Sequence, residues 1–326
     1  MNDPQAKATP SSPTELAQHQ VDQNELAQSE RVLGALRGTA IASSLARAAS
    51  GQDPQGPGSE SALQLFILDG LMDAIEWARA GVGADDTACL WLGALRWVKA
   101  AQGQVPDGAP EPPTRWISAA IGSLDGATGG DPQNLAGLQS PEMSQPRRPW
   151  NRRAATVPEL ASTDGPGVLA RAAALGLLEY AEEADVRRLA SSAAAFSHGS
   201  PSAHDAAADA ASVMYSVHQG VWAVRGALSA ILGRDCEPES GSRTALRRAL
   251  ESVGTVLGDL DGGSELHPER AWEAVTRLTA NADEGAAIYA GALVGALIGA
   301  AHLPAHSLRE DQAVTEMAQR YLDAVR

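Results

Sequence analysis

Several groups of side chains in this sequence have types and spacings that could do chemistry. Four arginines surround a tryptophan within seven residues: Arg147, Arg148, Trp150, Arg152 and Arg153. Guanidinium groups beside an indole could hold a phosphate or stack on a base. A solvated loop, or a loop that pairs with the chain's own acids, is the simpler interpretation, because exposed charges usually contribute little.

The histidines lack the spacing of a metal site. His198 and His204 are six residues apart, so on one helix their side chains would point about 240° from each other. His302 and His306 are four residues apart, but Pro304 interrupts the helix that would present both on one face. We therefore predict no zinc site at either pair.

Two other short sequences have a structural interpretation beside the chemical one. Residues 85–87, Asp-Asp-Thr, look like metal-binding acids, but Asp directly before an apolar helical pattern is typical of a helix N-cap. Residues 165–167, Gly-Pro-Gly, could present backbone amides to a diphosphate. The proline removes one of those amides.

Composition excludes several classes of protein. The 326 residues carry a formal charge of −15 and a pI near 4.8, which disfavours nucleic-acid binding. No stretch approaches 18 consecutive apolar residues, and the N-terminus lacks the pattern of a signal peptide, so we expect no membrane insertion and a cytoplasmic location. Cys89 and Cys236 form no CxxC pair, which gives no indication of a disulfide framework.

The elements that must position these residues are helices. Only 4 % of the residues are aromatic and alanine is abundant, which favours an all-α fold of about ten helices. We expect residues 1–28 to be a flexible tail and residues 29–326 to be one compact domain. Residues 103–166 are expected to be irregular apart from one short helix at 114–124. Helical periodicity is found at 31–51, 63–81, 87–103, 168–199, 203–233, 242–260, 267–281 and 284–304.

The segment 284–304 is apolar on every side, which is typical of a buried helix. It carries four glycines: Gly285, Gly291, Gly295 and Gly299. Glycines let backbones approach closely, so we expect this helix to be central and closely crossed by its neighbours.

From Arg31 to Arg326 the order of segments resembles the ADP-ribosylglycohydrolase family. The resemblance is carried by RVLGALRG, LFILDGL, NLAGLQSPEMSQPRRPWN, GPGVLARAAALGLL, SHGSPSAHDAA and AIYAGALVGALIGAAHLP. It implies an all-α fold and, for the family, a centre of two Mg²⁺ ions that positions a ribose and an attacking water. The family holds these ions with a T-D-D-T motif and a D-x-D-x-T motif.

At the positions that resemble these two motifs, the sequence departs from the family. The first motif falls on 58–61 (Gly-Ser-Glu-Ser) and the second on 282–286 (Ala-Asp-Glu-Gly-Ala). Glu60 and Glu284 still offer carboxylates, each one methylene longer, with Asp283 as a third. Mg²⁺ needs near-ideal octahedral oxygen ligands at about 2.0–2.1 Å. We therefore expect the two magnesium ions of the family to be absent, although one weakly held ion is conceivable.

These departures predict a catalytically inactive homologue. The scaffold glycines of the family are kept, whereas the metal ligands are substituted. The resemblance therefore implies a cleft that binds ADP-ribose or an ADP-ribosylated protein without cleaving it. The predicted ligand-binding residues are Ser59, Glu60, Gly165, Gly167, His198, Asp283 and Glu284.

Two alternatives remain open. The first is an active hydrolase that uses Glu60 and Glu284 with one metal or none, since two carboxylates about 5–9.5 Å apart can hydrolyse glycosidic bonds. Against it, such acids often pair with an arginine or have a raised pKa in a pocket. The second is an interaction protein with a closed cleft, which docks an unknown protein partner through the Arg147–Arg153 loop or the N-terminal tail.

Overall fold

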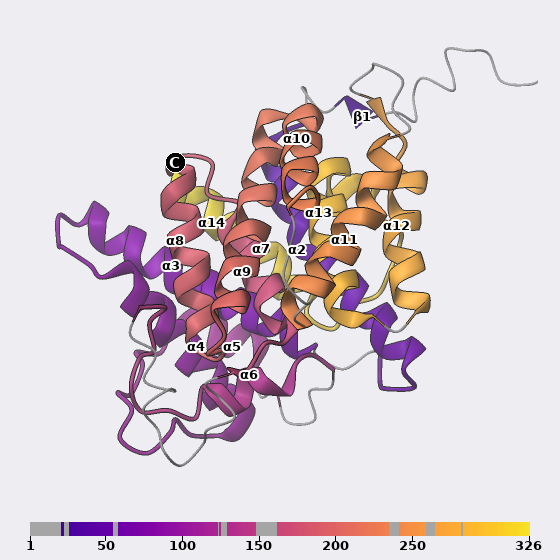
Figure 1. Ribbon diagram of the computed structural model, residues 1–326. Helices are drawn as coiled ribbons and strands as arrows, with labels where there is room; N and C mark the ends of the chain where they lie inside the picture. Colours follow the sequence, from indigo (N-terminus) through magenta and orange to yellow (C-terminus); the bar gives the residue numbers. More distant parts are fainter. Residues whose placement is uncertain are drawn as a thin grey trace, which may run out of the picture.

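The computed structural model describes residues 21–22, 26–54, 58–122, 124, 129–147, 162–234, 241–258, 265–281 and 283–326. Over these residues the chain is built from helices, with one short antiparallel pair of strands (Figure 1). The first half contains β1 (Val21–Asp22), α2 (Gln28–Ala49), α3 (Ser59–Arg79), α4 (Asp86–Gln102), α5 (Trp116–Ile121) and α6 (Pro132–Gly137).

The second half continues in the same way, and the predicted all-α fold is confirmed. Its elements are η3 (Pro166–Val168), α7 (Leu169–Leu175), α8 (Glu183–Ala195), α9 (Pro201–Tyr215), η4 (Ser216–Gln219), α10 (Val221–Leu232), α11 (Gly241–Gly258), β2 (Glu265–Leu266), α12 (Pro268–Ala280), α13 (Glu284–Ile298), η5 (Ala300–His302) and α14 (Asp311–Val325).

Helices α2 and α13 pack against each other at backbone distance in the centre of the fold (Figure 1). A Cβ added to Gly34 would lie 2.1 Å from the carbonyl oxygen of Gly295, and one added to Gly38 would lie 2.0 Å from that of Gly291. Neither contact is possible for any residue with a side chain. The expectation of a central, closely crossed helix is therefore confirmed.

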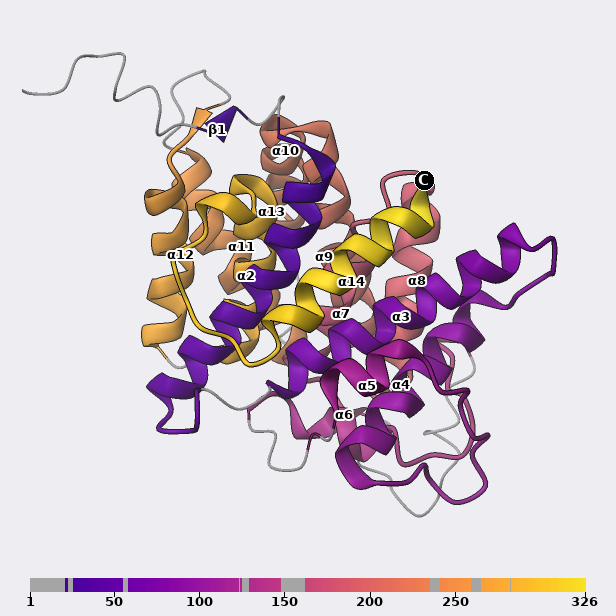
Figure 2. The same ribbon diagram turned by 180° about the vertical axis from the view of Figure 1, so that it is seen from behind.

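Helix α14 lies across α2 and α3, on the face of the molecule that is turned to the viewer in Figure 2. The sequence reading did not include this helix. Its signal is present, because the residues that α14 buries recur at helical spacing: Ala313, Val314, Met317, Ala318, Tyr321 and Leu322.

Three expectations about element boundaries were wrong. The passage 103–166 contains α6 as well as α5. The segment 168–199 breaks at Gly176, where a Cβ would lie 2.5 Å from Cβ of Met214 on α9. The segment 203–233 breaks before α10 at Gly220, whose φ of +98° does not continue a helix.

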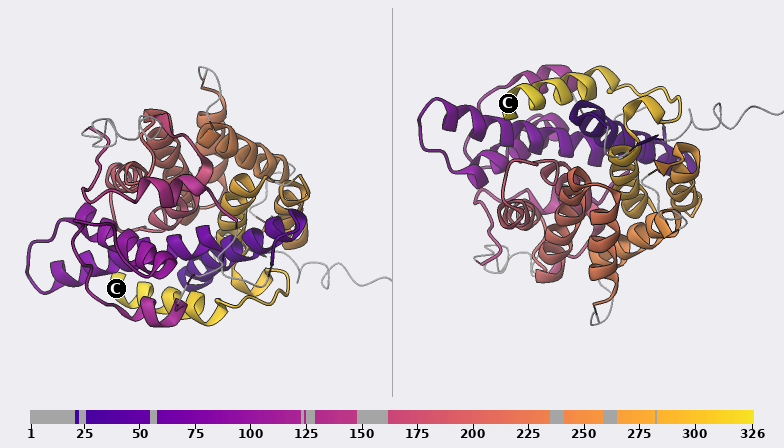
Figure 3. Two further views of the ribbon diagram at one scale, coloured as in Figure 1. Left: turned by 90° about the horizontal axis from the view of Figure 1, so that it is seen from below. Right: turned by 90° about the horizontal axis from the view of Figure 1, so that it is seen from above.

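Helices α3 and α4 form a hairpin that extends beyond the other helices (Figure 3). Its tip is exposed, and Trp77 and Val82 lie there. Asp85 begins α4 as its N-cap, accepting a hydrogen bond from the backbone N–H of Ala88 at 3.1 Å. The predicted capping role of residues 85–87 is confirmed at this residue.

Some sequence expectations concern residues outside the described ranges. Most of the predicted tail is among them, although Val21 and Asp22 pair with Leu266 and Glu265. In the arginine-rich loop the structure describes Arg147 only. Within the part of the chain that the structure describes, no helix is both long and apolar enough to cross a membrane.

Candidate active site

Two carboxylates meet at one pocket because two helices begin there. Glu60 lies in the first turn of α3 and Glu284 in the first turn of α13, where the positive end of the helix dipole favours a negative charge. Both line a pocket of about 380 Å³ that also includes Asp131, Gly167, Arg248 and Asp283. The structure therefore brings together the two glutamates that the family motifs pointed to.

Glu60 is 4 % exposed and accepts two hydrogen bonds, one from the N-cap of helix α6 and one from a side chain of that helix. Its Oε1 accepts hydrogen bonds from the backbone N–H of Asp131 at 2.7 Å and from Nδ2 of Asn134 at 2.8 Å. Burial raises the pKa of Glu60 to about 8, because these donors and Arg171 offset only part of the cost of desolvation. At neutral pH the carboxyl therefore carries a proton in most molecules.

Glu284 is held by the backbone of Gly130, the residue directly before Asp131. Its Oε2 accepts a hydrogen bond from the backbone N–H of Gly130 at 3.0 Å. Burial raises the pKa of Glu284, against the Gly130 N–H and the Arg47 guanidinium, which lower it. Gly129 and Gly130 have φ angles of +76° and +77°, and a Cβ on Gly129 would lie 2.5 Å from Oε1 of Glu284. The double glycine lets the main chain run directly against both glutamates.

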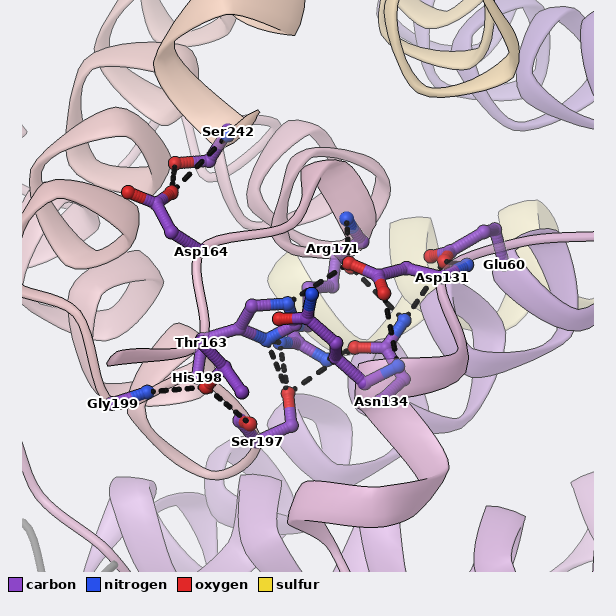
Figure 4. A network of polar contacts seen from close by, with 12 residues as sticks. Glu60, Asp131, Asn134, Thr163, Asp164, Arg171, Ser197, His198, Gly199 and Ser242 are labelled. Carbon is purple, nitrogen blue, oxygen red and sulfur yellow. Dashed lines mark hydrogen bonds and ion pairs between the residues drawn. The ribbon is translucent and has the colours of Figure 1, made fainter. Parts of the chain in front are cut away.

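Behind Glu60 lies a buried polar network (Figure 4). Arg171 donates to Oδ1 of Asn134 at 2.9 Å and to Oγ of Ser197 at 2.6 Å. Asp131 accepts from Nε2 of His198 at 3.0 Å and from the backbone N–H of Gly167 at 3.1 Å. Burial opposes ionisation of Asp131, but these hydrogen bonds lower its pKa below the usual value.

The neighbouring residues Ser197, His198 and Asp131 have the contacts of a serine–histidine–aspartate arrangement. Burial lowers the pKa of His198, so the ring is neutral at pH 7. Because the carboxylate of Asp131 only accepts, the ring proton lies on Nε2, and Nδ1 faces Oγ of Ser197 at 2.8 Å. Ser197 is fully buried and does not line the pocket, so we assign this group to positioning rather than to nucleophilic attack.

The predicted ligand-binding residues divide into two sets. Those that line the pocket are Glu60, Gly167, Asp283 and Glu284. Those that lie behind or beside it are Ser59, Gly165 and His198. The backbone N–H of Gly167, predicted to meet a diphosphate, already donates to Asp131. Gly165 packs so closely on Asp131 that a Cβ there would lie 1.8 Å from Oδ2.

Asp164, directly before Gly165, holds the loop of Gly165 and Gly167 in place through hydrogen bonds. Oδ1 of Asp164 accepts hydrogen bonds from the backbone N–H and the hydroxyl of Ser242 at the start of α11, and Oδ2 accepts from Ser200 at 3.2 Å (Figure 4). Ser200 is the N-cap of α9. The pocket wall is thereby tied to two helix N-termini.

Sequence reasoning missed Asp131, Asn134 and Arg248 as site residues. A signal for the first existed, because Asp directly before Pro132 is typical of an N-cap with proline at the first helical position. No signal was available for Arg248, which is one of several arginines on α11. It reaches the pocket and forms an ion pair with Oδ2 of Asp283 at 2.9 Å.

Comparison with known proteins agrees with this architecture. A model of the ADP-ribosylglycohydrolase family matches residues 24–326. The chain belongs to the ADP-ribosylglycohydrolase family. It is also similar to a solved structure described as an ADP-ribosylglycohydrolase-related protein complex, with a TM-score of 0.56 and 19 % identity over 92 % of this chain and 99 % of that one. A search of curated proteins found no match.

The donors at this site do not fit the two magnesium ions expected for an ADP-ribosylglycohydrolase. Glu60 is protonated at neutral pH and accepts two N–H groups, and a protonated carboxyl is a poor magnesium ligand. Asp283 caps α13 through the N–H of Ala286 at 3.3 Å and pairs with Arg248. No group of three acidic, histidine or cysteine side chains with metal-binding geometry occurs in the described residues. That magnesium does not bind remains a prediction, which this donor chemistry supports.

Proposed function

We propose that the chain binds the ADP-ribosyl group, free or on a modified protein, and does not cleave it by the metal-dependent route of the family. One observation carries this proposal. The glutamates at the positions of both metal motifs face a common pocket, but each accepts a hydrogen bond from the main chain, through Gly130 and Asp131.

The pocket chemistry suits a ribose with an anionic group beside it. Carboxyl oxygens of Glu60 and Glu284 at the wall can accept hydrogen bonds from ribose hydroxyls. Arg248 is a cationic side chain that lines this pocket, and its guanidinium is well placed for a diphosphate. The volume of about 380 Å³ lies within the range of small-molecule sites. An interaction protein with a closed cleft would have this space filled by side chains.

Calorimetric titration of ADP-ribose into the full chain tests the proposal. We expect saturable binding with the same Kd in millimolar Mg²⁺ and in EDTA, and no release of ADP-ribose from an arginine-linked substrate. Arg248→Gln should weaken binding by about tenfold, because a charge-assisted contact is lost. Arg247→Gln is the matched control, since Arg247 directly precedes Arg248 on α11 and pairs with Glu251. Absence of binding under both conditions contradicts the proposal.

A second candidate is hydrolysis without metal. The observation that favours it is that Glu60 is a buried acid with a pKa raised to about 8, in the same pocket as Glu284. Such a carboxyl can donate a proton to a leaving group while the second carboxylate acts as base or nucleophile. Release of ADP-ribose in EDTA, lost in both Glu60→Gln and Glu284→Gln, would establish this activity and exclude the first proposal.

A further inference from the structure

A cluster of arginines surrounds one buried aspartate, on the side of the molecule formed by helices α8 to α11. Asp209 on α9 is 1 % exposed. Its carboxylate accepts from Arg187 of α8 at 2.9 Å, from Arg234 after α10 at 2.9 Å and from Arg243 of α11 at 3.4 Å. Three helices and the segment that follows α10 thus contribute to one ionic cluster.

Asp209 binds more guanidinium groups than one carboxylate requires. One guanidinium can satisfy a buried carboxylate through two parallel hydrogen bonds. Two more increase the repulsion among the cations and the cost of their desolvation. Glu183 on α8 accepts a hydrogen bond from Ser212 nearby. Among the described residues, three guanidinium groups therefore share one buried carboxylate.

Two of these arginines face a pocket that is separate from the candidate active site. A pocket of about 530 Å³ lies between α8, α9 and α10 and is lined by Arg187, Arg234, Ser212 and Tyr215. The side chains of Arg187 and Arg234 are 35 % and 49 % exposed, so their outer edges are accessible to a ligand.

The hydrogen bonds of these two arginines leave N–H donors that do not bind the aspartate. Arg234 reaches both oxygens of Asp209 through Nη1, at 3.0 and 2.9 Å. Arg187 reaches Asp209 through Nη2 and the carbonyl oxygen of Ala208 through Nη1 at 3.4 Å. A guanidinium carries five N–H donors, so each has further donors beyond those that bind Asp209.

We propose that this pocket is a binding site for a phosphate or diphosphate group of a small molecule, held between Arg187 and Arg234. The negative charge of the ligand would be attracted by these two guanidinium groups. The planar N–H donors of two guanidinium groups match the geometry of phosphate oxygens. This site does not depend on the ADP-ribosyl pocket or on its function.

Titration of pyrophosphate and of inorganic phosphate into the full chain tests the site. Replacing an arginine disturbs Asp209, so the main variant leaves the cluster intact. Ala230 is exposed on α10 and lines the pocket, and Ala230→Glu places a carboxylate in the path of the anion. We expect Ala230→Glu to weaken pyrophosphate binding by at least about tenfold through like-charge repulsion. Ser229→Glu, exposed on the same helix but outside the pocket, should stay within about twofold of the unmodified chain.

A second pair of variants locates the ligand on the arginines. Arg234→Gln should lose pyrophosphate binding, whereas Arg188→Gln should keep it, because Arg188 on α8 pairs with Asp86 away from this pocket. A phosphoserine peptide distinguishes the sources of the group: tighter binding of this peptide than of pyrophosphate would overturn the assignment to a small molecule. No saturable binding of either anion, or equal affinities in Ala230→Glu and Ser229→Glu, would overturn the site itself.

Discussion

Asn134 connects the buried acid of the pocket to the buried base behind it. Its Nδ2 donates to Oε1 of Glu60 at 2.8 Å, and its Oδ1 accepts from Nη1 of Arg171 at 2.9 Å. Burial lowers the pKa of Arg171 to about 10, against the attraction of Glu60 and Asp131. A neutral amide thus separates the guanidinium from Glu60 and gives both a hydrogen bond.

Removing this amide should destabilise the fold. In Asn134→Ala, Arg171 and Glu60 each lose a buried partner, which costs about 1–3 kcal/mol for each unsatisfied group. We expect the free energy of unfolding, measured with urea, to fall by at least about 2 kcal/mol. Gln139→Ala, exposed just after α6, is the matched control and should change it by less than about 0.5 kcal/mol. Equal effects of the two variants would show that the network contributes little.

The raised pKa of Glu60 predicts a specific dependence of stability on pH. The folded state holds a proton up to about pH 8, whereas the unfolded chain releases it near the usual value of 4.5. The unfolded state binds fewer protons in this window, so the contribution of Glu60 is fully present below pH 4.5 and is lost as pH rises toward 8.

Glu60→Gln isolates this contribution, because glutamine resembles the protonated form and does not titrate. We expect the unmodified chain to lose stability relative to Glu60→Gln between pH 4.5 and 8. The difference between the two proteins is needed, because burial lowers the pKa of His198 and gives an opposite slope below pH 6.5. A parallel pair of pH profiles would contradict the raised pKa. Glu273→Gln, exposed on α12, is the control.

The sequence predicted the centre of the fold well because that centre depends on local pattern. The glycines of the segment 284–304 were recognised from their spacing, and two of them, Gly291 and Gly295, meet Gly38 and Gly34 at backbone distance. Helix α14 has an equally clear apolar pattern and was nevertheless missed, although the sequence contains the information needed to predict it.

The site was predictable only in part. Glu60 and Glu284 could be named because each lies at a fixed distance from an apolar helix that resembles a family segment. Their hydrogen bonds to Asp131 and Gly130 join residues 71 and 154 positions apart, so they follow from the tertiary fold. The Arg248–Asp283 ion pair has the same origin.

Magnesium should leave the stability of the free protein unchanged. The carboxyl groups of Glu60 and Glu284 already bind main-chain N–H groups, so Mg²⁺ would have to displace them and lose its own water ligands. We expect the thermal midpoint in 10 mM Mg²⁺ to equal that in EDTA at matched ionic strength. A saturable rise that disappears in Glu60→Gln would show that the site still binds a metal, because a ligand specific to the folded state raises the midpoint.

Glycine-to-alanine substitutions at a helix contact and at an open helix position should have opposite effects on stability. In Gly38→Ala the new Cβ would lie 2.0 Å from the carbonyl oxygen of Gly291, so the central helices must separate. We expect a loss of about 3 kcal/mol or more in the free energy of unfolding, as for severe overpacking. Gly226→Ala on α10 meets nothing within 4 Å and should instead stabilise the chain by about 0.4–1 kcal/mol, because alanine restricts the unfolded chain. Denaturation of both variants with urea measures the two signs in one experiment. A tolerated Gly38→Ala would mean that the two helices do not meet at backbone distance in solution.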